Sequence, residues 1–197
     1  MDTKAPGVVI ELTVDQQRIE DAITELLHAI GEDPSRPGLL DTPARVARFW
    51  AEFVDYDPGT LTTTFEEDAP NGPVTVSGMR VHSLCEHHLM PFWADVTIAY
   101  IPHGQVIGLS KLARIAHKHA HRLQLQERLV HGIGGELVDI AKTHDVMVLA
   151  TGEHSCMVSR GIKTPGLMTS QDCRGAFLAD PHLRAQVLAQ HQQSIEG

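Results

Sequence analysis

The chain of 197 residues has only three cysteines and no long apolar segment. Three is an odd number, which argues against a framework of disulfide bonds and favours a reducing compartment. No apolar run approaches the roughly 20 residues that a membrane-spanning helix needs, and the N-terminus does not show the basic and then apolar order of a secretory signal. From these absences we expect a cytoplasmic protein without a membrane partner.

Basic residues are scarce as well, with 16 Lys and Arg against 25 Asp and Glu and a net charge of −9. The imbalance lies in residues 1–72, which hold 15 acidic and 5 basic residues, whereas residues 73–197 hold 10 and 11. An acidic chain without a basic run lacks the electrostatic footprint of a nucleic-acid-binding protein. We therefore expect no nucleic-acid partner, although a few lysines or arginines suffice to bind a small anionic substrate.

The same division separates two predicted regions. Residues 1–72 are predicted to form an N-terminal helical region, because apolar residues recur at helical spacing over 14–30 and again from Thr42 onward. The acidic segment 60–72 is predicted to be a loop. Residues 73–197 are predicted to form a single domain of ordinary size, and an apolar content of 42% for the whole chain is enough for a core.

Within the second region the hydrophobic pattern changes from alternation to helical spacing and back. The predicted order is strand, strand, helix, helix, strand, strand, followed by a short last helix. Strands are predicted around 74–76, 96–100 and 146–150, and Ser110 is the predicted N-cap of the first helix. This order indicates an α+β fold, an antiparallel sheet with two long helices on one face. The open edges of such a sheet need cover or a partner.

A thiol, a carboxylate and two imidazoles occupy four consecutive positions that begin at Cys85. Cys85 and His88 are three residues apart, a spacing that zinc sites use. Further along the chain, His154 and Cys156 are two apart in a segment with the pattern of a strand, so both side chains would point to one face. We predict a zinc ion held by Cys85, His88 and Cys156, with His87 and His154 beside it as free imidazoles. Three protein ligands leave one position for water, as in catalytic zinc sites.

Each of these residues also has an ordinary interpretation. A lone cysteine is usually a small buried apolar residue, and a lone histidine is more often a hydrogen-bonded polar residue than a ligand. The two clusters taken together favour the metal site. Four other histidines fall at mixed helical angles and are interpreted as a solvated or subunit-facing helix surface: His117, His119, His121 and His131.

Over roughly residues 12–180 the sequence resembles GTP cyclohydrolase I. The resemblance rests on short stretches that follow one another in the family's order and with its spacing. These stretches are Cys85–His88, Tyr100–Pro102, Gly108–Arg114, Gln124–Leu129, His154–Cys156, Arg160-Gly161, Thr169-Ser170 and Arg174-Gly175, together with Leu40–Arg48 near the N-terminus. Any one stretch alone is a weak signal, whereas the ordered set is specific.

The resemblance implies the tunnelling fold for residues 73–197, a four-stranded antiparallel sheet with two long helices on one face. In this fold the sheets of five subunits join edge to edge into a barrel, and two pentamers stack into a homodecamer. Such an assembly would pair the open sheet edges. It would also place active sites between subunits, so that a neighbour supplies some of the substrate contacts.

The resemblance also implies a reaction and the residues that perform it. The reaction is zinc-dependent hydrolysis of GTP at C8, with release of formate and rearrangement to 7,8-dihydroneopterin triphosphate, the first step toward folate, other pterins or deazapurines. The implied zinc ligands are again Cys85, His88 and Cys156. The implied catalytic residues are His87, His154 and Ser110. The implied substrate contacts are Glu127 and Gln126 at the guanine and Lys111, Arg114, Arg160, Arg45 and Arg48 at the triphosphate.

Other interpretations stay open for the chain. Glu127 could be a solvated helix charge, and Ser110 could be only a helix cap. One alternative function is a related enzyme of the same fold that acts on another purine or pterin. Another is a non-catalytic, zinc-stabilised assembly protein, and the presence of both His87 and His154 argues against it, because a structural zinc site has no use for free imidazoles.

Overall fold

The structure, a computed structural model, describes residues 14–66 and 72–196. It separates into two compact units, the first ending at Tyr56 and the second beginning at Asp57. Within the first unit, helices α1 (Gln16–Ala29) and α2 (Thr42–Val54) pack against each other. Both helices lie where the hydrophobic spacing predicts them.

Local signals explain the limits of these two helices. The side chain of Asp15 accepts a hydrogen bond from the backbone N–H of Arg18 at 3.0 Å and so caps the start of α1. Gly31 follows the end of α1 with a positive φ of 85°, a conformation that suits glycine and stops the helix. Pro43 lies in the first turn of α2, where its missing N–H costs no hydrogen bond.

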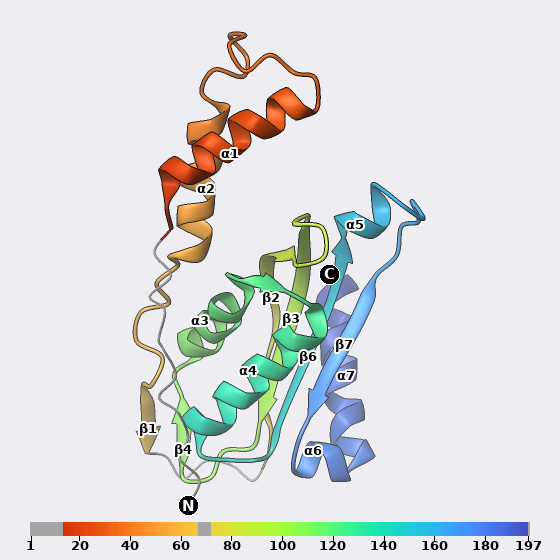
Figure 1. Cartoon of the computed structure of the whole chain (residues 1–197). Helices are drawn as coiled ribbons and strands as arrows, with labels where there is room; N and C mark the ends of the chain where they lie inside the picture. The colour runs from red at the N-terminus through yellow and green to blue at the C-terminus, as the bar shows by residue number, and fades with distance from the viewer. Residues whose placement is uncertain (1–13, 67–71, 197) are drawn as a thin grey trace, which may run out of the picture. The chain divides into compact units, whose positions relative to one another are not determined.

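The second unit is built on a five-stranded sheet with the strand order β5-β2-β3-β6-β7 (Figure 1). Strands β2, β3, β6 and β7 are antiparallel to their neighbours, and the short β5 pairs in parallel with β2. The strands are β2 (Val74–Cys85), β3 (Pro91–Tyr100), β5 (Leu123–Gln124), β6 (Val146–His154) and β7 (Met168–Cys173). The predicted α+β fold with an antiparallel sheet is confirmed, and β5 is an addition that the sequence did not indicate.

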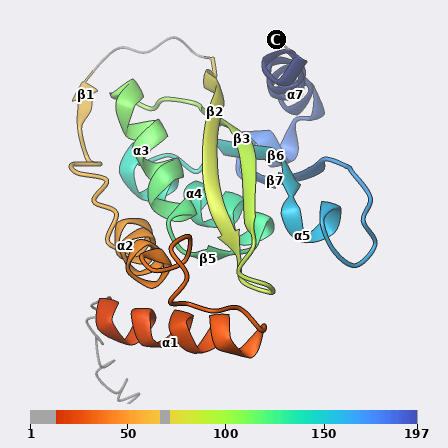
Figure 2. The ribbon, with the colours of Figure 1, turned by 90° about the horizontal axis from the view of Figure 1, so that it is seen from above.

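Two long helices, α3 (Leu109–Ala120) and α4 (Gln126–Ala141), cover one face of this sheet (Figures 1 and 2). Strand residues that point to this face pack against the apolar stripes of both helices, and this contact forms the main core. Fully buried members of this core are Val96, Ile98, Val148, Ala150, Leu112, Ile115, Leu129, Ile133 and Leu137.

The opposite face of the sheet is covered by the C-terminal helix α7 (Pro181–Glu196), which follows the short α6 (Ala176–Ala179) (Figure 2). Met147 and Leu149 point to this side, whereas their neighbours in the strand point to the main core. Strand β6 is therefore buried on both faces, which explains its unbroken apolar run. The sequence predicted this last helix but made it short, whereas α7 has 16 residues, and it did not predict the face that the helix covers. No helix among residues 14–66 and 72–196 is long and apolar enough to cross a membrane.

Two local predictions were wrong. Within the segment predicted as a loop, β1 (Thr64–Glu66) pairs antiparallel with β4 (Gln105–Ile107), while residues 67–71 lie outside the described part. Helix α3 begins at Leu109 with Gly108 as its N-cap, so Ser110 lies in the first turn and is not the cap. Strand β4, which pairs with β1, ends at Ile107, and the chain enters α3 directly after it. The helix therefore starts two residues earlier than predicted.

Candidate functional site

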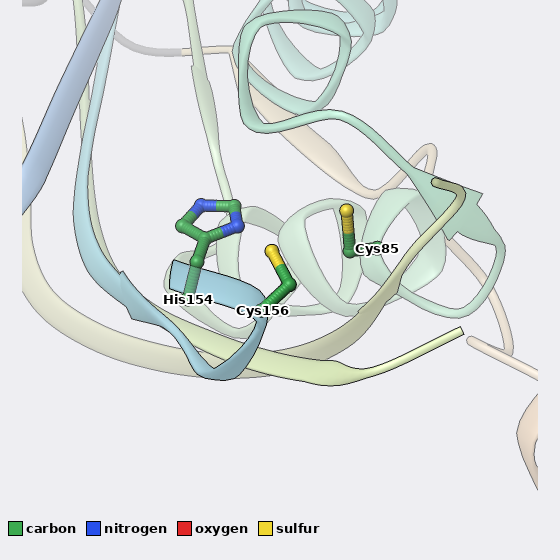
Figure 3. A group of neighbouring side chains, drawn as sticks. All are labelled: Cys85, His154 and Cys156. Carbon is green, nitrogen blue, oxygen red and sulfur yellow. The ribbon is translucent and has the colours of Figure 1, made fainter. Parts of the chain in front are cut away.

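Three side chains that could hold a metal ion converge where β2 and β6 end (Figure 3). Cys85 is the last residue of β2, His154 is the last residue of β6, and Cys156 lies in the helical turn α5 (Ser155–Val158). The two sulfur atoms and a ring nitrogen all lie within 4.8 Å of one another. Because β2 and β6 both pair antiparallel with β3, their C-terminal ends reach the same end of the sheet.

The local structure at His154 differs from the prediction. His154 and Cys156 were expected on one strand with both side chains on one face, but β6 ends at His154 and the chain turns into α5. The helical turn nevertheless brings the Cys156 sulfur back to the imidazole (Figure 3). The expected proximity is correct, and the expected reason for it is wrong.

The turn that follows β2 carries the other two imidazoles. The backbone N–H of Leu89 donates to the carbonyl oxygen of Cys85 at 2.8 Å, and Leu89 closes the turn with a φ of 56°. The Nδ1 atom of His87 lies 3.9 Å from the sulfur of Cys85. The Nε2 atom of His88 instead contacts the guanidinium of Arg160. The structure therefore groups Cys85 with His154, whereas the role of His88 as a ligand stays a prediction.

The imidazole of His154 is fixed from two sides. Its ring stacks on that of Phe92, with ring centres 4.4 Å apart and planes inclined by 7°. Its Nε2 atom lies 3.0 Å from Oε1 of Gln126. Burial lowers the pKa of His154, and the nearby carboxylate of Glu127 acts in the opposite direction. The result is a rigidly held ring beside the two thiols, in surroundings whose burial favours the neutral form.

The two thiols favour a cation between them. Burial raises the pKa of Cys156, and the adjacent Cys85 raises it further, while Arg160 acts in the opposite direction. A buried thiol resists ionisation next to a second sulfur, because two negative charges would lie close together. A bound metal ion removes this conflict, since it compensates both thiolates.

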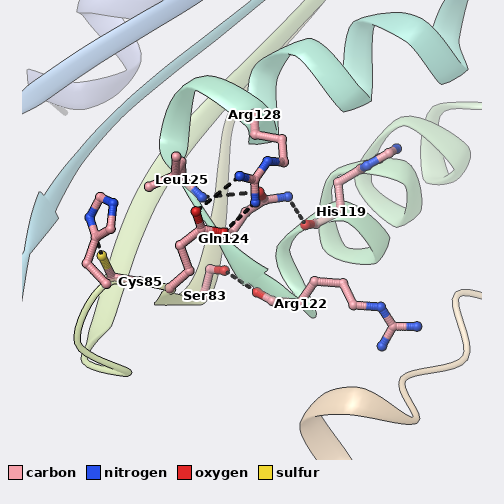
Figure 4. A network of polar contacts seen from close by, with 9 residues as sticks. Ser83, Cys85, His119, Arg122, Gln124, Leu125 and Arg128 are labelled. Carbon is pink, nitrogen blue, oxygen red and sulfur yellow. Dashed lines mark hydrogen bonds and ion pairs between the residues drawn. The ribbon is translucent and has the colours of Figure 1, made fainter. Parts of the chain in front are cut away.

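The first turn of α4 lies beside this group. Arg128 forms a two-pronged ion pair with Glu86, with nitrogen–oxygen distances of 2.5 and 3.1 Å (Figure 4). This pair fastens the turn after Cys85 to the start of α4, and Arg128 lowers the pKa of Glu86. Glu127 is exposed in the same first turn, so its carboxylate is available to a ligand.

A hydrogen-bond network joins the end of β2 to the neighbouring elements (Figure 4). The hydroxyl of Ser83 donates to the carbonyl oxygen of Ala120 at 2.6 Å, at the end of α3. The buried amide of Gln124 donates to the carbonyl oxygen of His119 at 3.0 Å and accepts from the N–H of Leu125 at 3.1 Å. The end of α3, strand β5 and the start of α4 are thus tied to the strand that presents Cys85.

Two predicted residues at the start of α3 lie far from Cys85 within one chain. Ser83 contacts Ala120 at the last turn of α3, whereas Ser110 and Lys111 lie in its first turn. At 1.5 Å per residue, the ten residues from Ser110 to Ala120 span about 15 Å along the helix axis. These two side chains therefore belong to the opposite end of α3 from the thiol group.

The predicted phosphate contacts are spread over both units. Arg160 follows α5 and contacts His88, so it lies at the thiol end of the sheet. Arg114 donates to the carbonyl oxygen of Pro58 at 3.1 Å. Arg45 and Arg48 lie on α2 in the first unit.

Sequence reasoning did not indicate three of the contacts that shape this site. These are the stacking of Phe92 on His154, the hydrogen bond from His154 to Gln126 and the ion pair of Arg128 with Glu86. Each joins residues that are far apart in the chain and depends on strand register or on the approach of α4. Short sequence motifs therefore do not predict such contacts.

A separate cavity of about 570 Å³ lies on the other face of the sheet. Its lining includes Thr151, Thr169, Leu188 and His191, from β6, β7 and α7. None of the predicted site residues lines it. The thiols and the imidazole of the candidate metal site therefore lie at the end of the sheet and not in this cavity.

Comparison with known proteins gives consistent matches. The model of the GTP cyclohydrolase I family matches residues 19–192. GTP cyclohydrolase 1 of Rhodopirellula baltica is 48% identical over 180 residues, which cover 89% of this chain and 78% of the relative. GTP cyclohydrolase 1 of Bacillus subtilis is 44% identical over 180 residues, which cover 89% and 95%. A solved structure of the archaeosine synthase QueF-Like in the apo form covers 53% of this chain at 17% identity with a TM-score of 0.41, a likeness too weak to bear on the fold.

Proposed function

Because the chain belongs to the GTP cyclohydrolase I family, we propose that it hydrolyses GTP at C8 of the guanine and rearranges the product to 7,8-dihydroneopterin triphosphate. C8 leaves as formate. Two water molecules are consumed, one in opening the imidazole ring and one in releasing formate, and one is returned when the pterin ring closes. The convergence of Cys85, His154 and Cys156 beside the first turn of α4 carries this proposal.

We propose zinc as the metal of this site. Two thiols and one imidazole are donors that zinc takes in catalytic sites, and three protein ligands leave a position for water. The imidazole predicted as the third ligand is that of His88, and the imidazole that lies with the two sulfurs is that of His154. When bound, the zinc supplies Lewis-acid chemistry and lowers the pKa of water toward neutrality.

The imidazoles and carboxylate of this chain supply the rest of the chemistry. We assign proton transfer to His154, which lies within 4.8 Å of both sulfur atoms, and to His87, whose Nδ1 atom lies 3.9 Å from the sulfur of Cys85, because imidazoles can accept and return protons near neutral pH. Glu127 offers two acceptor oxygens to the two donors of the guanine edge, N1–H and the amino group. The side chain of Gln126 is buried and hydrogen-bonded, so a contact of this residue with guanine would come from its backbone.

The distance of Ser110 and Lys111 from Cys85 supports a shared active site. We assign Ser110 to the ribose rearrangement and Lys111 to the triphosphate, but each lies at the wrong end of α3 to serve the Cys85 group of its own chain. A tunnelling-fold barrel with sheets joined edge to edge would bring them to a neighbour's site. It would also cover the open edge of β7. We therefore propose the homodecamer, two stacked pentamers, as the active form.

Two measurements test this assembly. Light scattering of the active protein is expected to report a decamer, and a stable, active monomer would contradict it. A Lys111→Ala chain and a Cys156→Ala chain are each expected to be inactive alone. Co-assembled from a mixture, they are expected to regain turnover, because some sites then combine an intact Lys111 with an intact Cys156. A mixture without turnover would show that both residues serve one chain.

Incubation of the purified protein with GTP tests the reaction itself. We expect formate and, after oxidation, a fluorescent pterin, with neither product from a Cys156→Ala control. An enzyme that acts on another purine or pterin would leave GTP unchanged. A zinc-stabilised assembly protein would bind the metal without turning over any of these substrates.

The remaining assignments follow from the same site. Arg160 lies at the thiol end of the sheet and is proposed to bind the triphosphate, together with Arg114, Arg45 and Arg48. Free thiols at the metal position require a reducing compartment, in accord with the expected cytoplasmic location. The product would enter a route to folate, another pterin or a deazapurine.

A further inference from the structure

The side chain of Gln126 is completely buried between two strands and the imidazole of His154. Its amide nitrogen donates to the carbonyl oxygen of Ala150 on β6 at 2.8 Å and to that of Met168 on β7 at 2.9 Å. The hydroxyl of Ser170 lies 3.2 Å from the same nitrogen. Its carbonyl oxygen lies 3.0 Å from Nε2 of His154. Every polar atom of the amide therefore has a partner.

These partners allow only one orientation of the amide. Backbone carbonyl oxygens accept hydrogen bonds and never donate, so the NH₂ group must face Ala150 and Met168. A flipped amide would place its own oxygen against two other oxygens inside the protein, and both backbone carbonyls would lose their donor. The oxygen of the Gln126 amide must therefore face His154.

The same reasoning extends to the ring of His154. An amide oxygen only accepts, so Nε2 of His154 must carry the proton of this hydrogen bond. A neutral imidazole carries one proton, and Nδ1 is then unprotonated. Since Nε2 faces Gln126, Nδ1 is the ring nitrogen on the side of the sulfurs of Cys85 and Cys156 (Figure 3).

We propose that Gln126 is a positioning residue that fixes the tautomer of His154 and presents its unprotonated Nδ1 to the metal position. Phe92 complements this role, since its stacked ring fixes the plane of the imidazole while Gln126 fixes its rotation. The inference rests on the proposed site and deepens it. His154 can thus act at Nδ1, as a ligand or as a proton acceptor, without first releasing a proton.

Nitrogen NMR of ¹⁵N-histidine-labelled, metal-free protein tests this inference directly, because the two ring nitrogens report which of them carries the proton. The signals of His154 are identified by their absence from a His154→Gln protein. In the wild type we expect a single tautomer with the proton on Nε2. In Gln126→Met, which keeps the length of the side chain but not its polar atoms, we expect a mixture of tautomers.

Gln124→Met is the matched control. Gln124 is two residues away, is buried and also hydrogen-bonds through its amide, but its partners are His119 and Leu125. This variant is expected to keep the wild-type tautomer of His154. With GTP, Gln126→Met is expected to lose about 10- to 100-fold in kcat, the usual effect of removing a group that orients a histidine at a metal site. KM should stay near the wild-type value, because the amide does not reach the exposed surface.

Three results would each overturn the inference. The first is a wild-type His154 with its proton on Nδ1, a measurement that needs no variant to fold. The second is a Gln126→Met protein with the wild-type tautomer, and the third is the same variant with the wild-type kcat. The NMR comparison needs no substrate, so an inactive wild type with the expected tautomer would contradict the proposed reaction and not the role of Gln126.

Discussion

The Nε2 atom of His191 on α7 lies 2.8 Å from the hydroxyl oxygen of Thr151 on β6. Its Nδ1 atom lies 2.8 Å from the hydroxyl oxygen of Thr97 on β3, and the hydroxyls of Thr151 and Thr169 are also 2.8 Å apart. His191 is 4% exposed. One buried imidazole thus ties the C-terminal helix to two strands, β3 and β6, and Thr151 extends the network to β7, on the face of the sheet opposite to α3 and α4.

This buried histidine is expected to make stability depend on pH. Burial lowers the pKa of His191 below its ordinary value of 6.5, and Asp95 acts in the opposite direction. The unfolded chain then binds the proton more readily than the folded chain. The contribution of His191 to the free energy of unfolding is fully present above about pH 6.5 and is lost as the pH falls toward the lower pKa of the folded state.

Thermal unfolding between about pH 8 and pH 5 measures this effect across the titration of histidine. We expect His191→Gln to be less stable than the wild type at the upper end and to lose less stability on acidification. His182→Gln is the control, because His182 lies exposed on the same helix. Equal slopes with pH for the wild type and His191→Gln would show that His191 does not contribute.

Gly152 is expected to tolerate no side chain. It faces Ala94 across the β3–β6 ladder, and a Cβ atom there would overlap the carbonyl oxygen of Trp93 and approach Cα of Ala94 to 2.8 Å. Both obstacles are backbone atoms of a buried strand, so they cannot move aside. We expect Gly152→Ala to lower the free energy of unfolding by about 3 kcal/mol, at the upper end of overpacking costs.

Denaturant titration of Gly152→Ala measures this loss. Gly72→Ala is the control, because among the described residues no atom beyond its neighbours in the chain lies within 4 Å of its Cβ position. A Gly152→Ala protein as stable as the wild type would mean that β3 and β6 can separate without cost, and so that the ladder presenting His154 is not rigid.

Much of the fold follows from periodicity. The alternation in β2 and β3 and the helical spacing in α3 and α4 predict these elements because each turns a regular row of apolar side chains into the main core. The prediction of a loop over residues 60–72 was wrong at β1 (Thr64–Glu66). A three-residue strand is too short to show a pattern, and its formation depends on its partner β4. Strand β5 (Leu123–Gln124) was not predicted, because it too is short and depends on its partner β2. The face that α7 covers was not predicted, because a strand that is apolar on both faces does not indicate which helix packs on which face.

The candidate site was predictable in its residue types but not in its geometry. The two thiols meet as predicted, because β2 and β6 end at the same end of the sheet and the helical turn α5 brings Cys156 back toward Cys85. Which imidazole lies beside the two sulfurs depends on the turn after β2 and on the buried amide of Gln126. Neither can be deduced from the spacing of residues in the sequence. Adjacent histidines such as His87 and His88 cannot be ranked from sequence, since one turn decides which of them faces inward.

Removal of single ligands is expected to separate the two candidate imidazoles. Zinc content of about one ion per chain should fall to near zero in Cys85→Ala and Cys156→Ala, because a site that loses one of three protein ligands binds weakly. His88→Ala should lose zinc if the predicted ligand is correct, and His154→Ala should lose it if the group in the structure is complete. Elemental analysis decides between them.

Cys173→Ala is the control for this series. Cys173 ends β7 and packs against the second core with Leu149, away from the other two thiols. Its removal should leave the zinc content unchanged. Full zinc content in Cys156→Ala would remove Cys156 from the ligand set and contradict the proposed site.

Glu127→Gln is expected to weaken recognition of guanine without disturbing the metal. The amide keeps the shape of the side chain but presents a donor to a donor of the guanine edge, a mismatch that costs about 2–4 kcal/mol, or roughly 30- to 1000-fold in kcat/KM. The penalty should be smaller with ITP, which lacks the exocyclic amino group and is already expected to be a poor substrate. Asp139→Asn, on an exposed part of the same helix, should behave like the wild type. Steady-state kinetics with both nucleotides test this, and a Glu127→Gln enzyme that turned over GTP like the wild type would make Glu127 a solvated helix charge.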